Sequence, residues 1–407
     1  MRIDDTDRER STKAYEEGLK EDLKWLGLEW GDTFNESDKF ADYDSAADKL
    51  REAGLLYACY ETSDDLDRQR KLARATGKPP IYNRAALKLT DDEKAAFEAE
   101  GRKPHWRFKL SGQRVEWEDL VRGKQSIDTS SLSDPILIRE DGSYLYTLPS
   151  CVDDIDAKIT HVVRGEDHVT NSGAQIEIFR ALGGEAPEMA HTPLLVGADG
   201  AGLSKRLGSL SIEQLREDGF EPLAIASLLA KIGTSDNVEV RSSLEELAGE
   251  FDFGKIGRAP ARFDEAELKK LNADILHEMP FEVAKDRLSD IDTRMTENPL
   301  FWETVRDNVD VLPDASKFIA IVFGDITPMI ADEDREFISQ AISLLPETEF
   351  GEGAWKEWTG VLKAETGRKG RGLFMPLRKA ITGMEHGPDM GAMLRLIGRD
   401  KVVQRLS

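Results

Sequence analysis

The chain contains few of the residues that build covalent cross-links or membrane spans. Its 407 residues include two cysteines, Cys59 and Cys151, which cannot form a disulfide framework. No run of about 18 apolar residues and no signal-peptide pattern is present, so we expect a cytoplasmic protein that does not bind membranes. Basic residues are outnumbered, 55 Lys and Arg against 78 Asp and Glu, for a net charge of −23. That charge disfavours general polyanion binding but does not exclude a local basic surface.

The length predicts roughly two to four domains, because a single core of this size is uncommon. Apolar residues at helical spacing predict helices over 11–27, around 44–53, over 221–233 and over 332–345, each ending at a glycine or followed by a glycine or proline. The segment 55–145 is highly charged, with turn residues and short β-like runs at 106–110 and 136–138. Beyond about residue 300 the pattern is almost wholly helical.

The most informative stretch is Gly202–Arg206, Gly-Leu-Ser-Lys-Arg, which follows a short apolar segment and a glycine-rich turn. A lysine on such a loop is suited to gripping a triphosphate, because its compact cation can stabilise charge on phosphoryl oxygens. By itself the motif is weak, since a basic pair beside glycines is more often a solvated turn. The interpretation therefore depends on the other motifs of the chain.

Several other segments occur in a characteristic order. They are Arg2–Asp7, Tyr144–Leu148, His161–His168, His191–Leu195 and, near the C-terminus, Gly367–Arg378. Together with the Gly-Leu-Ser-Lys-Arg stretch, this ordered set closely resembles the bacterial glutamyl-tRNA synthetases, which are class I aminoacyl-tRNA synthetases. The likeness covers essentially the whole chain.

The resemblance implies a fold and a domain order. The expected fold is an α/β catalytic domain of Rossmann type that is incomplete at its N-terminus. It is interrupted by an inserted α+β domain that binds the tRNA acceptor end, and all-α stem-contact and anticodon-binding domains follow. The expected boundaries are 1–54 and 144–208 for the two parts of the catalytic domain, 55–143 for the insert, 209–300 for the stem-contact domain and 301–407 for the anticodon-binding domain.

One family signature, His-Ile-Gly-His, has no counterpart, because no histidine precedes His105. In relatives this motif lies upstream of the Arg-Ile-Asp-Asp-Thr-Asp stretch, in a strand-and-helix unit of roughly 30 or more residues. We therefore expect the first strand and helix to be missing and adenylate formation by this chain to be poor. Two hypotheses follow: a glutamate–tRNA ligase whose start is misplaced or whose N-terminus was trimmed, and a non-catalytic tRNA-binding relative.

The resemblance assigns the reaction with ATP to one loop and one histidine. Lys205 and Arg206 are the expected catalytic cations. Ser204, Leu203 and His191 are expected to contact ATP together with Lys205, although a histidine before a proline is as often structural. The expected cofactors are ATP and the Mg²⁺ that accompanies it as a substrate-bound ion.

Four residues are implied in binding glutamate. Asp4 matches an acidic residue that contacts the α-ammonium group, and Arg164 matches an arginine that pairs bidentately with the γ-carboxylate. Tyr146 lines the same pocket, and His168 is carried over more weakly. Without the family, we would interpret Arg164 as a salt-bridge partner of Glu166 or Asp154.

Basic residues cluster in 363–379, and the resemblance implies that they contact tRNA. The expected contacts are Arg368, Lys369, Arg371 and Arg378, although most charge runs are simply solvated faces. The expected partners are glutamate and tRNA(Glu), acting with a monomer. The sequence leaves open whether tRNA(Gln) is also charged.

Some relatives hold zinc in the insert with a Cys-x-Cys pair and a later Cys/His pair. Here the matching positions read Cys59-Tyr60-Glu61 and Tyr82-Asn83-Arg84. A tetrahedral site cannot be assembled from these residues, so we expect no structural zinc and no other metal ligands.

Overall fold

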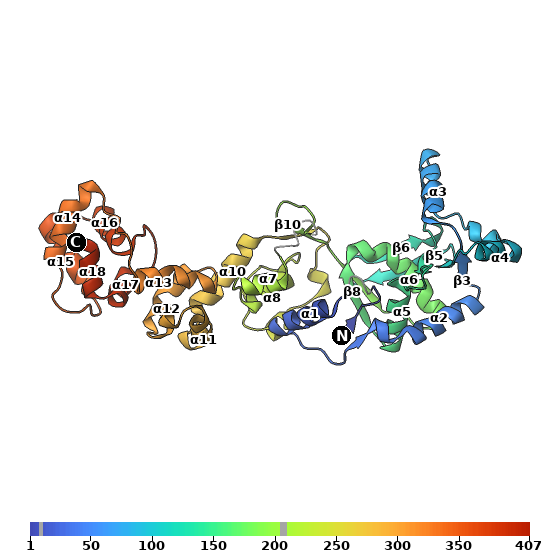
Figure 1. Ribbon diagram of the computed structural model, residues 1–407, viewed down its shortest axis with the longest axis horizontal. Helices are drawn as coiled ribbons and strands as arrows, with labels where there is room; N and C mark the ends of the chain where they lie inside the picture. Colours follow the sequence, from blue (N-terminus) through green and yellow to red (C-terminus); the bar gives the residue numbers. More distant parts are fainter. Residues whose placement is uncertain (8–10, 204–209) are drawn as a thin grey trace. The chain divides into compact units, whose positions relative to one another are not determined.

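The computed structural model describes residues 1–7, 11–203 and 210–407 (Figure 1). The chain divides into two compact units. The first comprises Met1–Lys205, Ala230–Asn237 and Glu245–Phe263, and the second comprises Arg206–Leu229, Val238–Leu244 and Asp264–Ser407. None of the helices in the described ranges is long and apolar enough to cross a membrane.

The first unit is built on short sheets, several of which contain parallel strands. One is the parallel pair of β1 (Arg2–Ile3) and β2 (Phe34–Asn35). Another has the order β6-β5-β9-β8, formed by β5 (Arg114–Asp119), β6 (Gly123–Asp128), β8 (His161–Gly165) and β9 (Glu188–Thr192). In it, β9 runs parallel to both β5 and β8, while β6 is antiparallel to β5.

The connection between β8 and β9 is α6 (Val169–Leu182), which makes a strand–helix–strand crossover of the kind that parallel strands require. The hairpin of β5 and β6 comes from the range predicted as the insert, 55–143. It joins β9 through a single pairing, Asp119 with Met189. The sheet therefore combines strands from two of the predicted segments.

The remainder of the insert forms an antiparallel sheet of β3 (Leu56–Cys59), β4 (His105–Phe108) and β7 (Ile136–Ile138). The β-like runs seen in the sequence at residues 106–110 and 136–138 are thus confirmed. Two helices accompany this sheet, α3 (Ser63–Ala75) and α4 (Asp91–Ala99). Figure 1 shows α3 projecting from the rest of its unit, in agreement with the absence of buried residues in this helix. A last pair of parallel strands is β10 (Leu195–Gly197) and β11 (Ala261–Phe263).

The predicted N-terminal helices are confirmed as α1 (Lys13–Trp25) and α2 (Phe40–Glu52). Thr12 caps α1 by accepting a hydrogen bond from the backbone N–H of Tyr15. No residue of α1 is buried, and Tyr15 and Leu19 are exposed, so the apolar stripe that predicted this helix does not lie in a core.

The core of the first unit lies between α2, α6 and α5 (Thr147–Asp156), which pack together against the sheets. Its fully buried side chains include Tyr43, Leu148, Cys151 and Phe179. The interpretation of Cys151 as a small buried apolar residue is therefore confirmed. This packing fixes the start of α5 and the face of α6, which both carry site residues.

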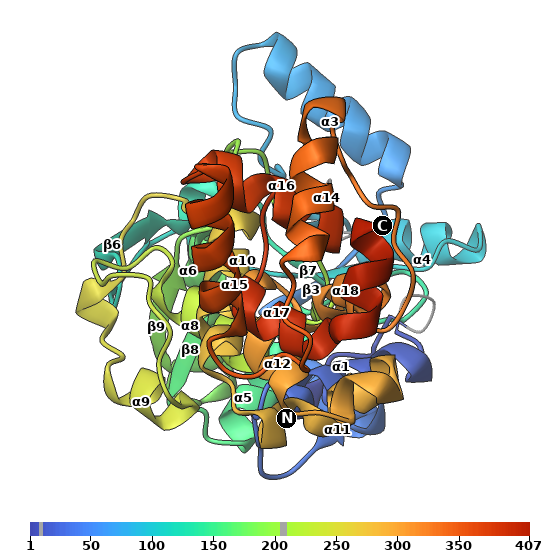
Figure 2. The same cartoon turned by 90° about the vertical axis from the view of Figure 1, so that its left-hand side faces the viewer.

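The second unit is helical, as predicted. Its helices are α7 (Ile212–Glu217), α8 (Pro222–Lys231, which ends in the first unit), α10 (Glu265–Glu278), α11 (Phe281–Ile291), α12 (Leu300–Val305), α13 (Ile319–Val322), α14 (Arg335–Ser343), α15 (Ala354–Thr366), α16 (Arg371–Thr382), α17 (Met390–Ile397) and α18 (Arg399–Leu406). A further short helix, α9 (Leu244–Gly249), lies almost wholly in the first unit. Figure 2 shows α14 to α18 gathered into one bundle. One continuous core runs through the second unit, with Trp302 and Trp358 fully buried in it.

Gly219, after α7, supplies a testable packing constraint. Its φ is +87°, and a Cβ atom there would lie 2.3 Å from Cδ of Pro313. Gly353 has the same φ of +87° but no heavy atom within 4 Å of the added Cβ. We expect Gly353→Ala to cost about 1–2 kcal/mol from backbone strain alone, and Gly219→Ala to cost about 1–3 kcal/mol more from the clash. Urea unfolding of the two variants measures this difference, and equal losses would contradict it.

Candidate active site

The site is built where two parallel strands end. Arg164 is the penultimate residue of β8 and His191 the penultimate residue of β9, and the strand register pairs them directly. The carboxyl ends of parallel strands are where open α/β sheets bind their ligands. The local pairing of β8 with β9 thus places a cation and an imidazole at a position suited to ligand binding.

The guanidinium of Arg164 is held by side chains from three elements. Its Nε donates to Nε2 of His191 at 3.3 Å, and its Nη1 donates to the hydroxyl of Tyr146 at 3.0 Å. Its Nη2 donates to Ser172 Oγ and Gln175 Oε1, both at 2.7 Å. A guanidinium has five N–H donors, so these partners leave one N–H on Nη1. The described contacts therefore leave a single N–H rather than a free two-pronged fork.

Tyr146 and His168 lie on the exposed side of the Arg164 guanidinium and its partners. Tyr146 immediately precedes α5, remains 39% exposed, and its ring meets that of His168 edge-on at 5.9 Å. Because the Tyr146 hydroxyl accepts from Arg164, its own proton is directed to another acceptor. The structure thus brings together Tyr146, Arg164 and His168, three of the four residues predicted to bind glutamate.

His191 lies behind this group and is fully buried. Its Nδ1 hydrogen-bonds Asp119 at 2.5 Å, and its Nε2 faces Ser172 Oγ at 3.0 Å as well as Arg164. Burial lowers the pKa of His191, against the opposing effect of Asp119. In this arrangement His191 contacts the arginine rather than solvent, and its contact with ATP stays a prediction.

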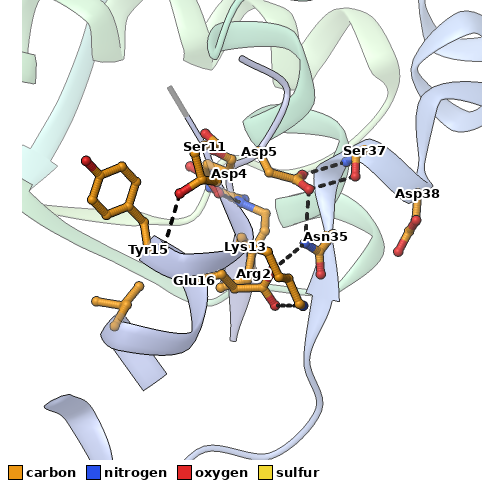
Figure 3. A pocket seen from close by; sticks show the side chains of 13 residues that line it. Arg2, Asp4, Asp5, Ser11, Lys13, Tyr15, Glu16, Asn35, Ser37 and Asp38 are labelled. Carbon is orange, nitrogen blue, oxygen red and sulfur yellow. Dashed lines mark hydrogen bonds and ion pairs between the residues drawn. The ribbon is translucent and has the colours of Figure 1, made fainter. Parts of the chain in front are cut away.

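Asp4, the fourth residue of the predicted glutamate site, lies beside Arg2 (Figure 3) and belongs to an acidic cluster around that arginine. Arg2 contacts Asp4 at 2.8 Å, Asp154 at 2.9 Å, Glu36 at 3.6 Å and Asp153 at 4.0 Å. Asp153 also pairs with Lys39 at 2.9 Å, so two cations serve these four carboxylates, of which Asp4 is the most exposed. A further cation at this place would find an electrostatically favourable position.

A pocket of about 920 Å³ adjoins Asp4 and is lined by residues of β1, β2 and α1. Figure 3 shows Asp5 bound to Asn35 and Ser37 on one side of this pocket and Tyr15 on the other. The cluster is also linked to Arg164 electrostatically. Burial raises the pKa of Asp154, and both Arg2 and Arg164 oppose that rise.

The predicted ATP loop is described only in part. Gly202 pairs with Val196 of β10, and Leu203 follows it, half-buried. Ser204, Lys205 and Arg206 lie outside the described residues, so their roles stay predictions.

Sequence reasoning missed His105, which lies close to two of the residues considered for zinc. Ligand atoms of Cys59, Glu61 and His105 all lie within 4.8 Å of one another. His105 is distant in sequence from the other two, so no local spacing pointed to it. Its Nε2 and the Oε2 of Glu61 are buried and have no hydrogen-bond partner among the described residues. The donor set considered from the sequence was therefore incomplete.

The donor set still does not fit a structural zinc site. Such sites use four ligands, and thiols bind as thiolates. Burial raises the pKa of Cys59 to about 12, which disfavours the thiolate that a metal would need. At the other matching positions, Tyr82 donates to Glu61 at 2.6 Å and Arg84 binds Asp134 at 2.7 Å. We derive no step through a metal at this place.

The basic residues predicted to contact tRNA differ in what they bind. Arg368 pairs with Asp334 and lies over the ring of Phe337 at 4.3 Å. Arg378 donates to the carbonyl of Pro388 at 3.0 Å, and burial lowers its pKa. Lys369, between α15 and α16, and Arg371, the first residue of α16, are exposed. Of the four, these two are the most accessible to a ligand.

Comparison with family models identifies both halves of the chain. Residues 1–270 match the catalytic domain of class I tRNA synthetases for glutamate and glutamine, and residues 277–407 match an anticodon-binding domain. The chain belongs to this class I tRNA synthetase family. Use of ATP and an interaction with tRNA are general properties that membership implies.

Relatives within the class I family are similar over the whole chain. Glutamate–tRNA ligase 2 of Hyphomonas neptunium is 66% identical, and glutamate–tRNA ligase 1 of Maricaulis maris is 58% identical. In both cases the alignment covers 100% of this chain and 91% of the relative. The crystal structure of glutamate-tRNA synthetase from Elizabethkingia anophelis matches with a TM-score of 0.85 at 25% identity, covering 100% of this chain and 91% of that one. The expected fold class is thereby confirmed.

Glu36 offers a test of the acidic cluster. Burial, reinforced by Asp4, raises its pKa from 4.5 to about 7. The folded chain therefore holds this proton more tightly than the unfolded chain, so the contribution of Glu36 to stability is complete below about pH 4.5 and is lost as the pH rises through 7. Relative to Glu36→Gln, the wild-type chain should lose on the order of 2 kcal/mol between pH 5 and pH 8. Measuring the free energy of unfolding of both proteins at pH 5 and at pH 8 tests this loss.

The exposed Glu29→Gln variant is the control for that comparison, because it removes one carboxylate from the surface. Its stability should follow the wild-type chain at both pH values. A Glu36→Gln variant that also followed the wild-type chain would show that Glu36 is not a buried, titrating group.

Proposed function

We propose that this chain is a glutamate–tRNA ligase, which activates glutamate with ATP and transfers the glutamyl group to the 3′ end of tRNA(Glu). The observation that carries the proposal is the hydrogen-bonding state of Arg164. One N–H of its Nη1 is unused by the described partners, and the neighbouring Tyr146 hydroxyl has its proton to give. The names of the relatives, which are ligases at 66% and 58% identity, support it and disfavour a non-catalytic tRNA-binding relative.

Two donors converging at this point suit a carboxylate. We propose that the γ-carboxylate of glutamate accepts one hydrogen bond from Nη1 of Arg164 and one from Tyr146, in place of the bidentate fork expected from the sequence. The amide of glutamine presents an NH₂ group to one of these donors, which leaves buried polar groups unpaired and is costly. His168 would close the aromatic side of the pocket through its contact with Tyr146.

The α-ammonium group of glutamate is proposed to lie near Asp4. Four carboxylates that share only Arg2 and Lys39 attract a further cation, and Asp4 is the most exposed among them. The reacting α-carboxylate then attacks the α-phosphorus of ATP and displaces pyrophosphate. Catalysis of such a transfer depends on positioning and on charge stabilisation rather than on a protein nucleophile.

For the nucleotide, we propose that Lys205 and Arg206 stabilise the phosphates of ATP·Mg²⁺, with Ser204 and Leu203 shaping the loop. The lysine charge is needed most in the transition state, when charge moves onto the departing pyrophosphate. His191 can reach ATP only after leaving its buried position, so we assign it to the arginine instead.

For tRNA, we propose that Lys369 and Arg371 contact backbone phosphates, and that Arg368 and Arg378 mainly hold the loop and helix that present them. The five predicted domain segments are part of this proposal, with 301–407 binding the anticodon arm. We propose that the chain charges tRNA(Glu) as a monomer in the cytoplasm. Charging of tRNA(Gln) is the second activity to test.

The function is tested by ATP–pyrophosphate exchange with glutamate in the presence of tRNA(Glu). Wild-type exchange should depend on glutamate. Arg164→Gln should raise KM for glutamate by a factor that corresponds to about 2–5 kcal/mol and leave KM for ATP nearly unchanged, because the γ-carboxylate loses its charged partner. Lys205→Ala should show the opposite signature, a lower kcat with tRNA affinity intact. Exchange by the wild-type chain that does not respond to glutamate, or identical signatures for both variants, would refute the assignment.

The tRNA contacts are tested by the salt dependence of binding. Replacing Lys369 and Arg371 together by alanine should weaken tRNA affinity and reduce the slope of log K against log salt by roughly 0.7–0.9 for each phosphate that is no longer neutralised. The control removes Lys356 and Arg395, two exposed cations elsewhere in the same helical unit. An unchanged slope in the first variant, or an equal change in the control, would show that Lys369 and Arg371 are ordinary solvated surface residues that do not contact tRNA phosphates.

A further inference from the structure

We infer that Asp119 and His191 are positioning residues for glutamate recognition, because together they fix the direction of the Arg164 guanidinium. The inference rests on the proposed function, since it concerns the arginine that would bind the γ-carboxylate. The three residues lie near or at the ends of three adjacent strands, β5, β9 and β8, in the order in which they contact one another.

Both carboxylate oxygens of Asp119 form hydrogen bonds with neighbouring groups. Its Oδ1 accepts backbone N–H bonds from Val121 at 3.1 Å, Arg122 at 2.9 Å and His191 at 3.1 Å, and its Oδ2 takes Nδ1 of His191 at 2.5 Å. Burial tends to raise the pKa of Asp119, but these hydrogen bonds outweigh it and the pKa falls below its usual value. The carboxylate therefore stays ionised and can only accept hydrogen bonds.

The ionised carboxylate sets the tautomer of His191. A group that only accepts requires the proton on Nδ1, and burial keeps the imidazole neutral, so Nε2 presents a lone pair. That lone pair meets the Nε–H of Arg164 at 3.3 Å. The tautomer thus makes one edge of the guanidinium an attractive contact, and the opposite tautomer would set two N–H groups against each other.

Ser172 and Gln175 hold the second edge of the guanidinium from α6. With Nε and Nη2 both engaged, the plane of the group is fixed, and only Nη1 is left beside Tyr146 on the exposed side. Asp119 and His191 therefore help to set the direction of the last N–H of Arg164, although neither residue lines the pocket beside Asp4. Such outer partners typically change the affinity of a site by about 10–100-fold when they are removed.

Asp119→Asn is the variant that separates these roles. Its amide oxygen can keep the backbone N–H bonds, so its NH₂ group must face Nδ1 and force the proton of His191 onto Nε2. We expect glutamate affinity, measured by calorimetry on the whole chain, to fall by about 10–100-fold, with ATP affinity within about twofold of wild type. The ¹⁵N shifts of the His191 ring should report the exchanged tautomer.

The matched control is Asp134→Asn in the insert. Asp134 is equally buried and likewise accepts from a backbone N–H, that of Leu110 at 3.0 Å, as well as from Arg84. Its hydrogen bonds lie within the insert, away from the partners of Arg164, so its replacement should lower stability without changing glutamate affinity. A loss of glutamate affinity equal to that of Asp119→Asn would show a general effect of damaged folding and overturn the inference.

A second pair of variants covers the case in which Asp119→Asn does not fold. His191→Gln keeps an acceptor oxygen that can reach Nε of Arg164, whereas His191→Leu is of similar size and has none. Glutamate should bind the Gln variant at least about tenfold more tightly than the Leu variant. Equal affinities would overturn the inference. Failure of the wild-type chain to bind glutamate would instead refute the proposed function, so the two failures are distinguishable.

Discussion

The site depends on the register between β8 and β9, which places Arg164 opposite His191 at the carboxyl ends of two parallel strands. Because neighbouring residues of a strand point to opposite faces, a shift of one residue would turn Arg164 away from both Tyr146 and Ser172. The register is supported by the α6 crossover and by β5, which adds Asp119 at the adjacent strand end. The position of the arginine and its contact with His191 are consequences of this pairing.

Charge is distributed in the chain in a way that its net value of −23 conceals. Four carboxylates converge on Arg2, and the burial of Glu36 among them raises its pKa to about 7. Burying several like charges is unfavourable unless a cation compensates them. A site that receives the α-ammonium group of an amino acid can bind that cation because it offsets the excess negative charge. In the helical unit, by contrast, Lys369 and Arg371 provide local positive charge that the total does not reveal.

The two compact units separate two physical tasks. In the first, short sheets hold polar side chains at strand ends, and the apolar residues of α2, α5 and α6 keep those strands in place. In the second, a continuous helical core surrounds Trp302 and Trp358, and the basic residues lie at helix ends and loops. Membership of the class I tRNA synthetase family accounts for this division, since amino-acid activation needs a rigid site and tRNA contact needs an extended surface.

The sequence by itself determined the family, the order of the elements and the ends of several helices, because these depend on local signals. Helical spacing, the Thr12 cap and Gly54 are all read within a few residues, and they predicted α1 and α2 correctly. The sequence also singled out Tyr146, Arg164 and His168, through short motifs.

Only the tertiary structure decided which residues act together at the site. Asp119 meets His191 across 72 residues of sequence, and His105 meets Cys59 across an antiparallel pair. Neither contact has a periodic or local signature. The number of N–H donors left on Arg164 is likewise a property of its surroundings, because hydrogen bonds to Ser172 and Gln175 form only when α6 packs beside β8.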